Sequence, residues 1–372
     1  MNIQGTPAGR GARHPAVAHL SELHMAQFAY RLNRIKAEVM DSLGEKDARY
    51  IRRVIRVQRL LELGGRLVIF AGILHWSGFV IGALMLGLAK ILENMEIGHN
   101  VLHGQWDWLR DPDIHSTTWE WDSVCPSSQW QRSHNFLHHK WTNVIGMDRD
   151  YGYMILRFSD KQPWQPLYLI QPLTNLMMAL TFQWGLVLYD DEMAELRRSE
   201  NGSERAREKM RHAVRKVLRQ VCKDYLLFPL LAGPFFLHVL LANMGANVMR
   251  NIWAYAVIFC GHFPEGVEEF TPEQVADESE GHWHVRQIVG SANIDGGPLM
   301  HLMTGNLSHQ IEHHLFPMMP SNRYAEVAPR VRALCEEYGI PYNSRALGPQ
   351  FASVWAKVFR YALPPRRRVV PA

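Results

Sequence analysis

This 372-residue chain has few cysteines and little net charge. The four cysteines stand far apart and form no CxxC pair, which excludes a disulfide framework, a zinc knuckle and an iron–sulfur cluster. A formal net charge of only +4 argues against nucleic acid as a partner. No GxGxxG segment is present, so there is no dinucleotide-binding fingerprint. The chain is instead rich in histidine and in long apolar stretches.

The apolar stretches are long enough to cross a lipid bilayer, which takes about 20 helical residues. We expect two helical hairpins. The first has spans at about 58–75 and 78–97 with a turn near His75, and the second has spans at 225–244 and 246–262 separated by little more than Gly245. These four spans define an all-α membrane protein.

A further apolar segment, 164–188, contains Pro166 and Pro172 and is predicted to lie at the membrane interface rather than to span it. The basic stretches 46–66 and 197–223, one before each hairpin, are expected to face the cytosol. The alternative is that 164–188 spans the bilayer and another apolar block does not.

Both ends of the chain are polar. Residues 1–56 lack the apolar core of a signal peptide and are expected to form a cytosolic, partly amphipathic segment. Residues 343–372 are expected to form a basic tail, whose arginines at 366–368 either contact anionic lipid headgroups or belong to a solvated terminus.

Eight of the 19 histidines fall in three short clusters, one HxxxH and two HxxxHH. Side chains four positions apart share one face of a helix, so two imidazoles can point at one metal. A single HxxxH pair is often incidental, but three such patterns in one chain are not. The clusters are His99 and His103; His134, His138 and His139; and His309, His313 and His314.

Eight imidazoles are too many for one zinc ion, which takes four ligands, and two metals are therefore indicated. Neutral imidazole suits iron, zinc, copper and nickel alike, so the residues alone do not choose the metal. The setting beside apolar helices, with no obvious hydrolytic carboxylate, favours iron and O2 chemistry.

The segments GHNVLHGQWDW, HNFLHHKWTN and NLSHQIEHHLFP resemble the three histidine boxes of the membrane fatty acid desaturase family. The longer run GHNVLHGQWDWLRDPDIHSTTWEWDSVCP is similar to bacterial acyl-CoA desaturases. The resemblance implies a desaturase domain over about 57–342, with two transmembrane hairpins and a helical cytosolic cap that holds a di-iron site.

Carried over box by box, the resemblance makes seven of the clustered histidines iron ligands. In the third box, Gln310 stands where related desaturases have histidine, and either the adjacent His309 takes over the ligand role or Gln310 itself completes the box. His262, at the cytosolic end of the last span, matches a further family ligand. The expected set is His99, His103, His134, His138, His139, His262, His309, His313 and His314.

Ligating histidines usually donate their second N–H to a carboxylate or carbonyl group. The candidates for such contacts are Asp107, Asp122, Asp148, Asp150, Gln310 and Glu312. Tryptophans around the first two boxes either form an interfacial belt or line an acyl channel. The candidate substrate contacts are Trp106, Trp108, Arg110 and Trp141.

The expected function is O2-dependent desaturation of a long-chain acyl group, carried as acyl-CoA or as a lipid. The chain lacks redox domains of its own, so its electrons are expected from a separate ferredoxin- or flavin-type NAD(P)H reductase, docking on 197–223. The expected location is the bacterial cytoplasmic membrane, with the site facing the cytosol. The alternatives are an alkane hydroxylase of the same di-iron class and a histidine-rich membrane metal transporter, which predicts polar residues inside the spans.

Overall fold

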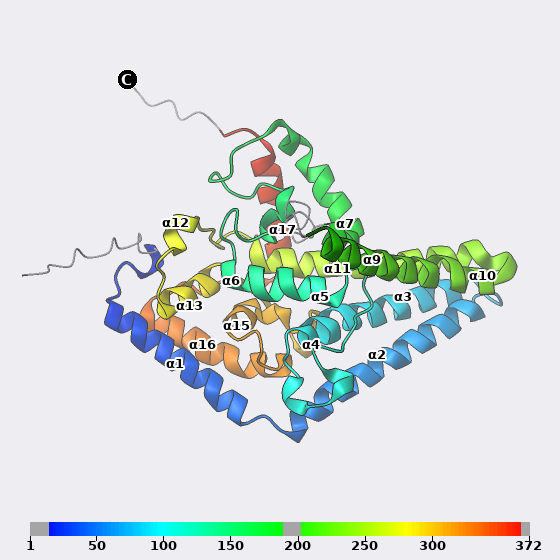
Figure 1. Ribbon diagram of the computed structural model, residues 1–372, viewed down its shortest axis with the longest axis horizontal. Coiled ribbons are helices and arrows are strands. Elements are labelled where there is room, and N and C mark those ends of the chain that lie inside the picture. The colour runs from blue at the N-terminus through cyan, green and yellow to red at the C-terminus, as the bar shows by residue number, and fades with distance from the viewer. Residues whose placement is uncertain (1–14, 189–201, 366–372) are drawn as a thin grey trace, which may run out of the picture.

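The computed structural model describes residues 15–188 and 202–365, and the regular structure in these ranges is almost entirely helical, as predicted (Figure 1). Two short strands, β1 (Asn293–Asp295) and β2 (Ser344–Ala346), pair in parallel. The α-helices are α1 (Glu22–Asp41), α2 (Glu45–Ala71), α3 (Ser77–Leu92), α4 (Asn100–Leu102), α5 (Ser127–Gln131), α6 (His139–Trp141), α7 (Gln171–Leu188), α9 (Gly202–Val221), α10 (Phe228–Leu231), α11 (Phe236–His262), α12 (Pro272–Val275), α13 (Glu280–Val289), α14 (Pro298–Met303), α15 (Gln310–Leu315), α16 (Tyr324–Tyr338) and α17 (Leu347–Ala362).

Shorter helical turns connect these helices, and three of them are π-helical: η2 (Glu93–His99), η5 (Arg132–His138) and η8 (Cys222–Leu227). The 3-10 turns are η1 (Pro15–Val17), η3 (Asp107–Leu109), η4 (Pro112–Ile114), η6 (Tyr151–Met154), η7 (Pro166–Ile170), η9 (Gly233–Phe235), η10 (Leu307–His309) and η11 (Ser321–Arg323).

The first predicted hairpin is present as α2 and α3, which turn at residues 72–76 as expected from the sequence. Small residues let the two helices approach closely. A Cβ atom at Gly82 would lie 2.6 Å from the backbone nitrogen of Ile69. Large apolar side chains on the outer faces stay exposed, among them Leu63, Leu67 and Leu84. The hairpin therefore presents an apolar surface on the side away from its partner helices.

The second hairpin differs from the prediction. No break occurs at Gly245, and α11 continues through it for 27 residues, or about 40 Å. The reversal comes earlier, where Gly233 adopts a φ of 55° directly before Pro234. A glycine inside a helix costs only about 1 kcal/mol relative to alanine, and the packing of α11 outweighs that cost. The predicted boundary between spans 225–244 and 246–262 is thus wrong by about twelve residues.

By length and composition, one stretch of the described residues is apolar enough to cross a membrane, Ser77–Leu102. It joins α3, η2 and α4 in one helical run. The helix α11 has a similar length but carries polar side chains in its interior, among them Asn243, Asn247 and Arg250. Figure 1 shows α2, α3, α10 and α11 extending together toward one end of the molecule.

The remaining helices form a cap at the other end. Helices α1, α13, α15 and α16 share one apolar core. Helices α7 and α17 pack on α11 around a second core, which includes Val354 and Val358 of the predicted C-terminal tail. The arginines at 366–368 and the first part of the basic segment 197–223 lie outside the described residues.

Candidate metal centre

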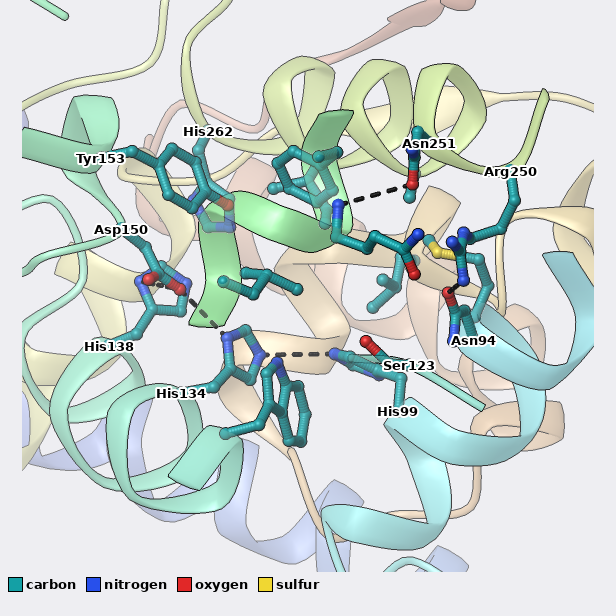
Figure 2. A pocket seen from close by; sticks show the side chains of 18 of the residues that line it. Asn94, His99, Ser123, His134, His138, Asp150, Tyr153, Arg250, Asn251 and His262 are labelled. Atoms are coloured by element: carbon teal, nitrogen blue, oxygen red, sulfur yellow. Dashed lines mark hydrogen bonds and ion pairs between the residues drawn. The ribbon is translucent and has the colours of Figure 1, made fainter. Parts of the chain in front are cut away.

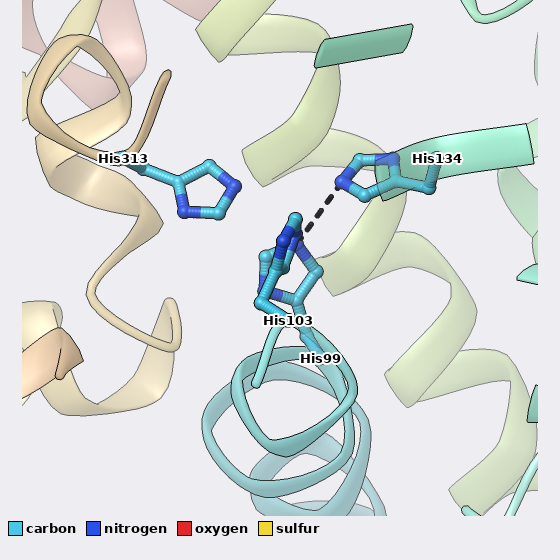
Figure 3. A group of neighbouring side chains, drawn as sticks. All are labelled: His99, His103, His134 and His313. Carbon is cyan, nitrogen blue, oxygen red and sulfur yellow. Dashed lines mark hydrogen bonds between the residues drawn. The ribbon is translucent and has the colours of Figure 1, made fainter. Parts of the chain in front are cut away.

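All three histidine clusters converge between the cap and the long helices. The first group contains two histidines from the η2–α4 run and one each from η5 and α15 (Figure 3). One ring nitrogen from each lies within 4.8 Å of the others. The members are His99, His103, His134 and His313.

A second group combines the C-terminal ends of three helical elements that are remote in sequence. It consists of His138 from η5, His262 from the last turn of α11 and His314 from α15, all buried. His139 lies between the two groups. Its ring centroid is 4.7 Å from that of His103 and 4.4 Å from that of His314. The eight histidines thus form one continuous cluster, which contains two groups that could each hold a metal ion.

Hydrogen bonds at Nδ1 fix the orientation of several rings. His138 donates to Asp148 at 3.0 Å, and His134 donates to Asp150 at 3.1 Å. Such bonds place the proton on Nδ1 and turn the lone pair of Nε2 toward the centre of the cluster. The sequence predicted both carboxylates in this role.

Three further rings are held by residues that the sequence analysis missed. His99 donates to the side-chain oxygen of Asn100, His314 to that of Gln287, and His313 to the hydroxyl of Tyr324. The bond to Asn100 spans 3.1 Å and joins sequence neighbours, so an Asn after a box histidine is a usable signal. Gln287 and Tyr324 come from α13 and α16, and no local pattern marks them.

The arrangement of Nε2 atoms fits a bound cation. Nε2 of His99 lies 3.3 Å from Nε2 of His134, and Nε2 of His262 lies 3.2 Å from Nε2 of His314. Because His99 and His134 both donate through Nδ1, their Nε2 lone pairs point at each other at this distance, which is unfavourable without a proton or metal between them. Within the described ranges, several more ring nitrogens are buried without any hydrogen-bond partner: Nε2 of His103, His138 and His313, and both nitrogens of His139.

Burial sets the protonation of the cluster. It lowers the pKa of His103, His139 and His313 well below the ordinary value, which keeps these rings neutral, as metal ligation requires. Burial also acts to lower the pKa of His138, but the nearby carboxylates of Asp148 and Asp150 outweigh it and raise that pKa. The site therefore consists largely of neutral imidazoles, and one of them, His138, has the negative charge of two carboxylates on the side away from the centre of the cluster.

The sequence leaves open whether His309 or Gln310 completes the third box, and the two side chains lie in different places in the structure. Nε2 of Gln310 lies 3.0 Å from Nε2 of His262, so Gln310 faces the second group. His309 lies elsewhere, with its ring centroid 4.5 Å from that of His301, and belongs to neither group. The turn η10 ends at His309 and α15 begins at Gln310, which directs the two side chains differently.

The other predicted carboxylates do not contact the histidine cluster. Asp107 accepts hydrogen bonds from Ser116, and Asp122 pairs with Lys90 at 3.1 Å. Glu312 lies in the third box but turns toward Asn293, whose side chain donates to it at 2.8 Å. Burial raises the pKa of Glu312 to about 7. These three acids have structural partners of their own.

A slot opens beside both histidine groups (Figure 2). Its walls include His99, His134, His138 and His262, and they continue through side chains such as Met95, Phe182, Leu186, Ala254 and Ile258. About half of the lining residues are polar, but most of the surface that they expose to the slot is apolar, so the slot suits a hydrocarbon chain.

None of the four predicted substrate contacts lines the slot. Trp106 is fully buried in a separate core with Ile51 and Val54, and Trp141 packs on the core of the cap. Trp108 and Arg110 lie in and directly after η3. The tryptophans that do line the slot are Trp121 and Trp130.

Gly305 controls the approach of the third box to the first. Its φ is +68°, and an added Cβ would lie 2.3 Å from the carbonyl oxygen of Met95. We expect Gly305→Ala to lower the free energy of unfolding by roughly 2–4 kcal/mol, because backbone strain and a steric clash add. Thermal unfolding of the detergent-solubilised protein measures this loss.

Gly245→Ala is the matched control, since a Cβ there meets no atom of the described residues within 4 Å and the backbone is helical. It is expected to be neutral or to stabilise the protein by about 1 kcal/mol. Equal melting temperatures for the two variants would contradict the close approach at Gly305, and a large loss in Gly245→Ala would contradict the continuity of α11.

The family of the chain follows from this site and from comparison with known proteins. Residues 74–346 match the model of the family described as fatty acid desaturase. The chain belongs to the fatty acid desaturase family, and it is a fatty acid desaturase with a histidine cluster that fits a metal site.

Individual relatives agree. The chain is 46% identical over 351 residues to an NADPH-dependent stearoyl-CoA 9-desaturase of Mycobacterium tuberculosis, which covers 93% of this chain and 82% of the relative. It is 25% identical over 291 residues to an sn-1 linoleoyl-lipid 6-desaturase of Synechocystis, covering 76% and 79% of the two chains. Human fatty acid desaturase 3 is 31% identical over 105 residues, 28% of this chain and 22% of the relative. No solved structure matches the chain.

Proposed function

We propose that this desaturase introduces a double bond into a long-chain acyl-CoA at a pair of irons, with O2 as oxidant and electrons from a separate NAD(P)H-linked reductase. The observation that carries the proposal is the pair of imidazole groups at the wall of an apolar slot. The mycobacterial relative is named for stearoyl-CoA, NADPH and the 9-position, which supports this substrate class and these electrons.

The residues proposed to hold the metals are the two groups, with His139 between them. One iron is assigned to His99, His103, His134 and His313, and the other to His138, His262 and His314. Gln310 completes the second set, directly or through water, since its Oε1 has no partner among the described residues. His309 is not part of the proposed ligand set.

Two irons, when bound, supply the reduction of O2 and the removal of two hydrogen atoms from adjacent methylenes. Overall, the acyl chain loses two hydrogens and gains a double bond, while O2, two electrons and two protons complete two molecules of water. The protein contributes the position of the chain, because the slot passes both groups. Its apolar walls also exclude water from the oxidation.

We further propose that the two hairpins, formed by α2 with α3 and by η8 and α10 with α11, cross the membrane and that the cap faces the cytosol. The exposed apolar side chains of α2 and α3, together with Leu230 and Leu237 of the second hairpin, support this placement. The segment α7 exposes Leu173 and Met177 beside the cap and is assigned to the membrane interface. The assignment keeps all three histidine boxes on one side of the bilayer.

Expression in a bacterial host that lacks desaturases, with a compatible ferredoxin reductase supplied, tests the proposed function. Mass spectrometry of the host's fatty acids is expected to show new monounsaturated chains, with the double bond at the 9-position. Hydroxylated chains without double bonds would contradict desaturation. A double bond at another position would contradict only the 9-position, which is carried over from the mycobacterial relative.

A further inference from the structure

Charged side chains form a cluster between the long helices, beyond the end of the slot. Asp224 of η8 pairs with Lys90 at 2.9 Å and with Arg66 at 3.2 Å, and Asp122 pairs with Lys90 and Lys223. Lys90 and Asp224 are almost fully buried. Burying an ionisable group inside a membrane segment costs free energy, so such groups usually serve a function. None of these charged side chains contacts the histidines.

Arg250 of α11 joins this cluster to the slot. Its guanidinium donates to the side-chain oxygen of Asn94 at 3.0 Å, to the carbonyl of Asp122 at 3.3 Å and to the side-chain oxygen of Asn247 at 3.2 Å. Only 1% of Arg250 is exposed to solvent, and both Arg250 and Asn94 line the slot. Figure 2 shows this pair at one end of the slot and His138 and Asp150 at the other.

The slot ends at this pair. On α11 the lining residues run from His262 back to Arg250, and on the α3–η2 run they extend from His99 back to Asn94. Farther from the cap the two helices are in direct contact, because a Cβ at Gly87 would lie 2.6 Å from the sulfur of Met249. The hydrogen bond between Asn94 and Arg250 therefore closes the slot where the helices meet.

The position of Arg250 gives the slot a fixed depth. Arg250 precedes His262 by twelve positions in one helix, which corresponds to about 18 Å along its axis. If the proposed function holds, the polar carrier of the substrate stays at the surface of the cap, and the methyl end points toward Arg250. An apolar side chain can move aside to make room for a methyl group. A guanidinium held by three hydrogen bonds in a buried ionic cluster cannot, because it would lose these bonds.

We propose that Arg250, positioned by Asn94 and Asn247, is a specificity-determining residue that stops the methyl end of the acyl chain. It limits the number of carbons that fit beyond the site of desaturation. The inference rests on the proposed function, but it concerns a residue outside the metal centre.

Arg250→Met is the direct test, because methionine lacks the charge and is flexible, so it leaves room for a longer chain. The desaturase-lacking host that carries the variant is fed saturated fatty acids of sixteen, eighteen, twenty and twenty-two carbons. The ratio of twenty-carbon to eighteen-carbon monounsaturated products is expected to rise roughly tenfold or more over the wild type, since each methylene that fits changes the selectivity by about that factor.

Arg66→Met is the matched control. It removes a cation from the same cluster, but Arg66 does not line the slot, and the ratio of products is expected to stay at the wild-type value. Asn94→Ala is a second variant, which frees the guanidinium without removing it and is expected to shift the ratio in the same direction by less.

The outcomes separate the two proposals. A wild type that produces no double bonds overturns the proposed function. An active wild type with unchanged ratios in both Arg250→Met and Asn94→Ala, or an equal shift in Arg66→Met, overturns the role of Arg250 and leaves the proposed function in place.

Discussion

A His313→Ala variant is expected to lose double-bond formation by roughly a hundredfold or more and to retain half of the iron or less. Its Nε2 is buried, has no hydrogen-bond partner among the residues of the described ranges, and lies within 4.8 Å of ring nitrogens from the first two boxes. Removal of an outer partner of a metal ligand already costs about 10- to 100-fold, so loss of a ligand costs more. Product analysis and elemental analysis of the purified protein measure the two effects.

The control for this variant is His309→Ala in the same box. His309 lies against His301 and outside both groups, so this variant is expected to keep its iron and most of its activity. A loss of iron in His309→Ala as large as in His313→Ala would contradict the assignment of Gln310 rather than His309 to the centre.

The second large effect is expected from Asp148→Asn. Both oxygens of Asp148 lie 3.0 Å from Nδ1 of His138, and they also accept from the backbone N–H of Asn143 and Asp150. The carboxylate raises the pKa of His138 and fixes its proton on Nδ1, and an amide loses the charge and presents an N–H on one side. The affinity for iron is expected to fall by roughly 10- to 100-fold.

Iron retained by purified protein over a series of chelator concentrations measures that affinity. Asp160→Asn serves as the control, because Asp160 is exposed and, among the described residues, pairs with Arg157 alone. Retention curves that coincide for Asp148→Asn and the wild type would show that His138 needs no fixed tautomer and would remove Asp148 from the proposed site.

The histidine boxes were predictable because their geometry is local. Residues four apart on an α-helix face the same way, so the shared group of His99 and His103 follows from spacing alone. His134 and His138 have the same spacing but lie in different groups, and the π-helical turn η5 that contains them does not keep the α-helical period. Asp148 and Asp150 were also predicted, since they follow the second box closely in the chain. Gln287 and Tyr324 were not, because they come from helices that only the tertiary fold brings to the rings.

The fold was predictable to a similar degree. The helical content and the first hairpin follow from apolar stretches broken by a polar turn, whereas the second turn was placed at Gly245 rather than at Gly233 and Pro234. A glycine in helical conformation, such as Gly245, does not end a helix. A glycine with positive φ next to a proline, such as Gly233 before Pro234, does end it. Asp122 shows the same limit, since its lysine partners on other helices decide its role.

The π-helical turns η2 and η5 have a consequence for how such a centre arises. Each contains the first histidine of a box. Its backbone hydrogen bonds span five residues instead of the four of an α-helix, which is equivalent to one residue added to a regular helix. Each residue turns a helix by about 100°, so an added residue re-aims everything that follows without moving what precedes it. In η2, the apolar contacts of α3 and the direction of His99 and His103 are thereby set independently, so one helical run packs among apolar helices along α3 and presents two histidines to the metal centre at its end.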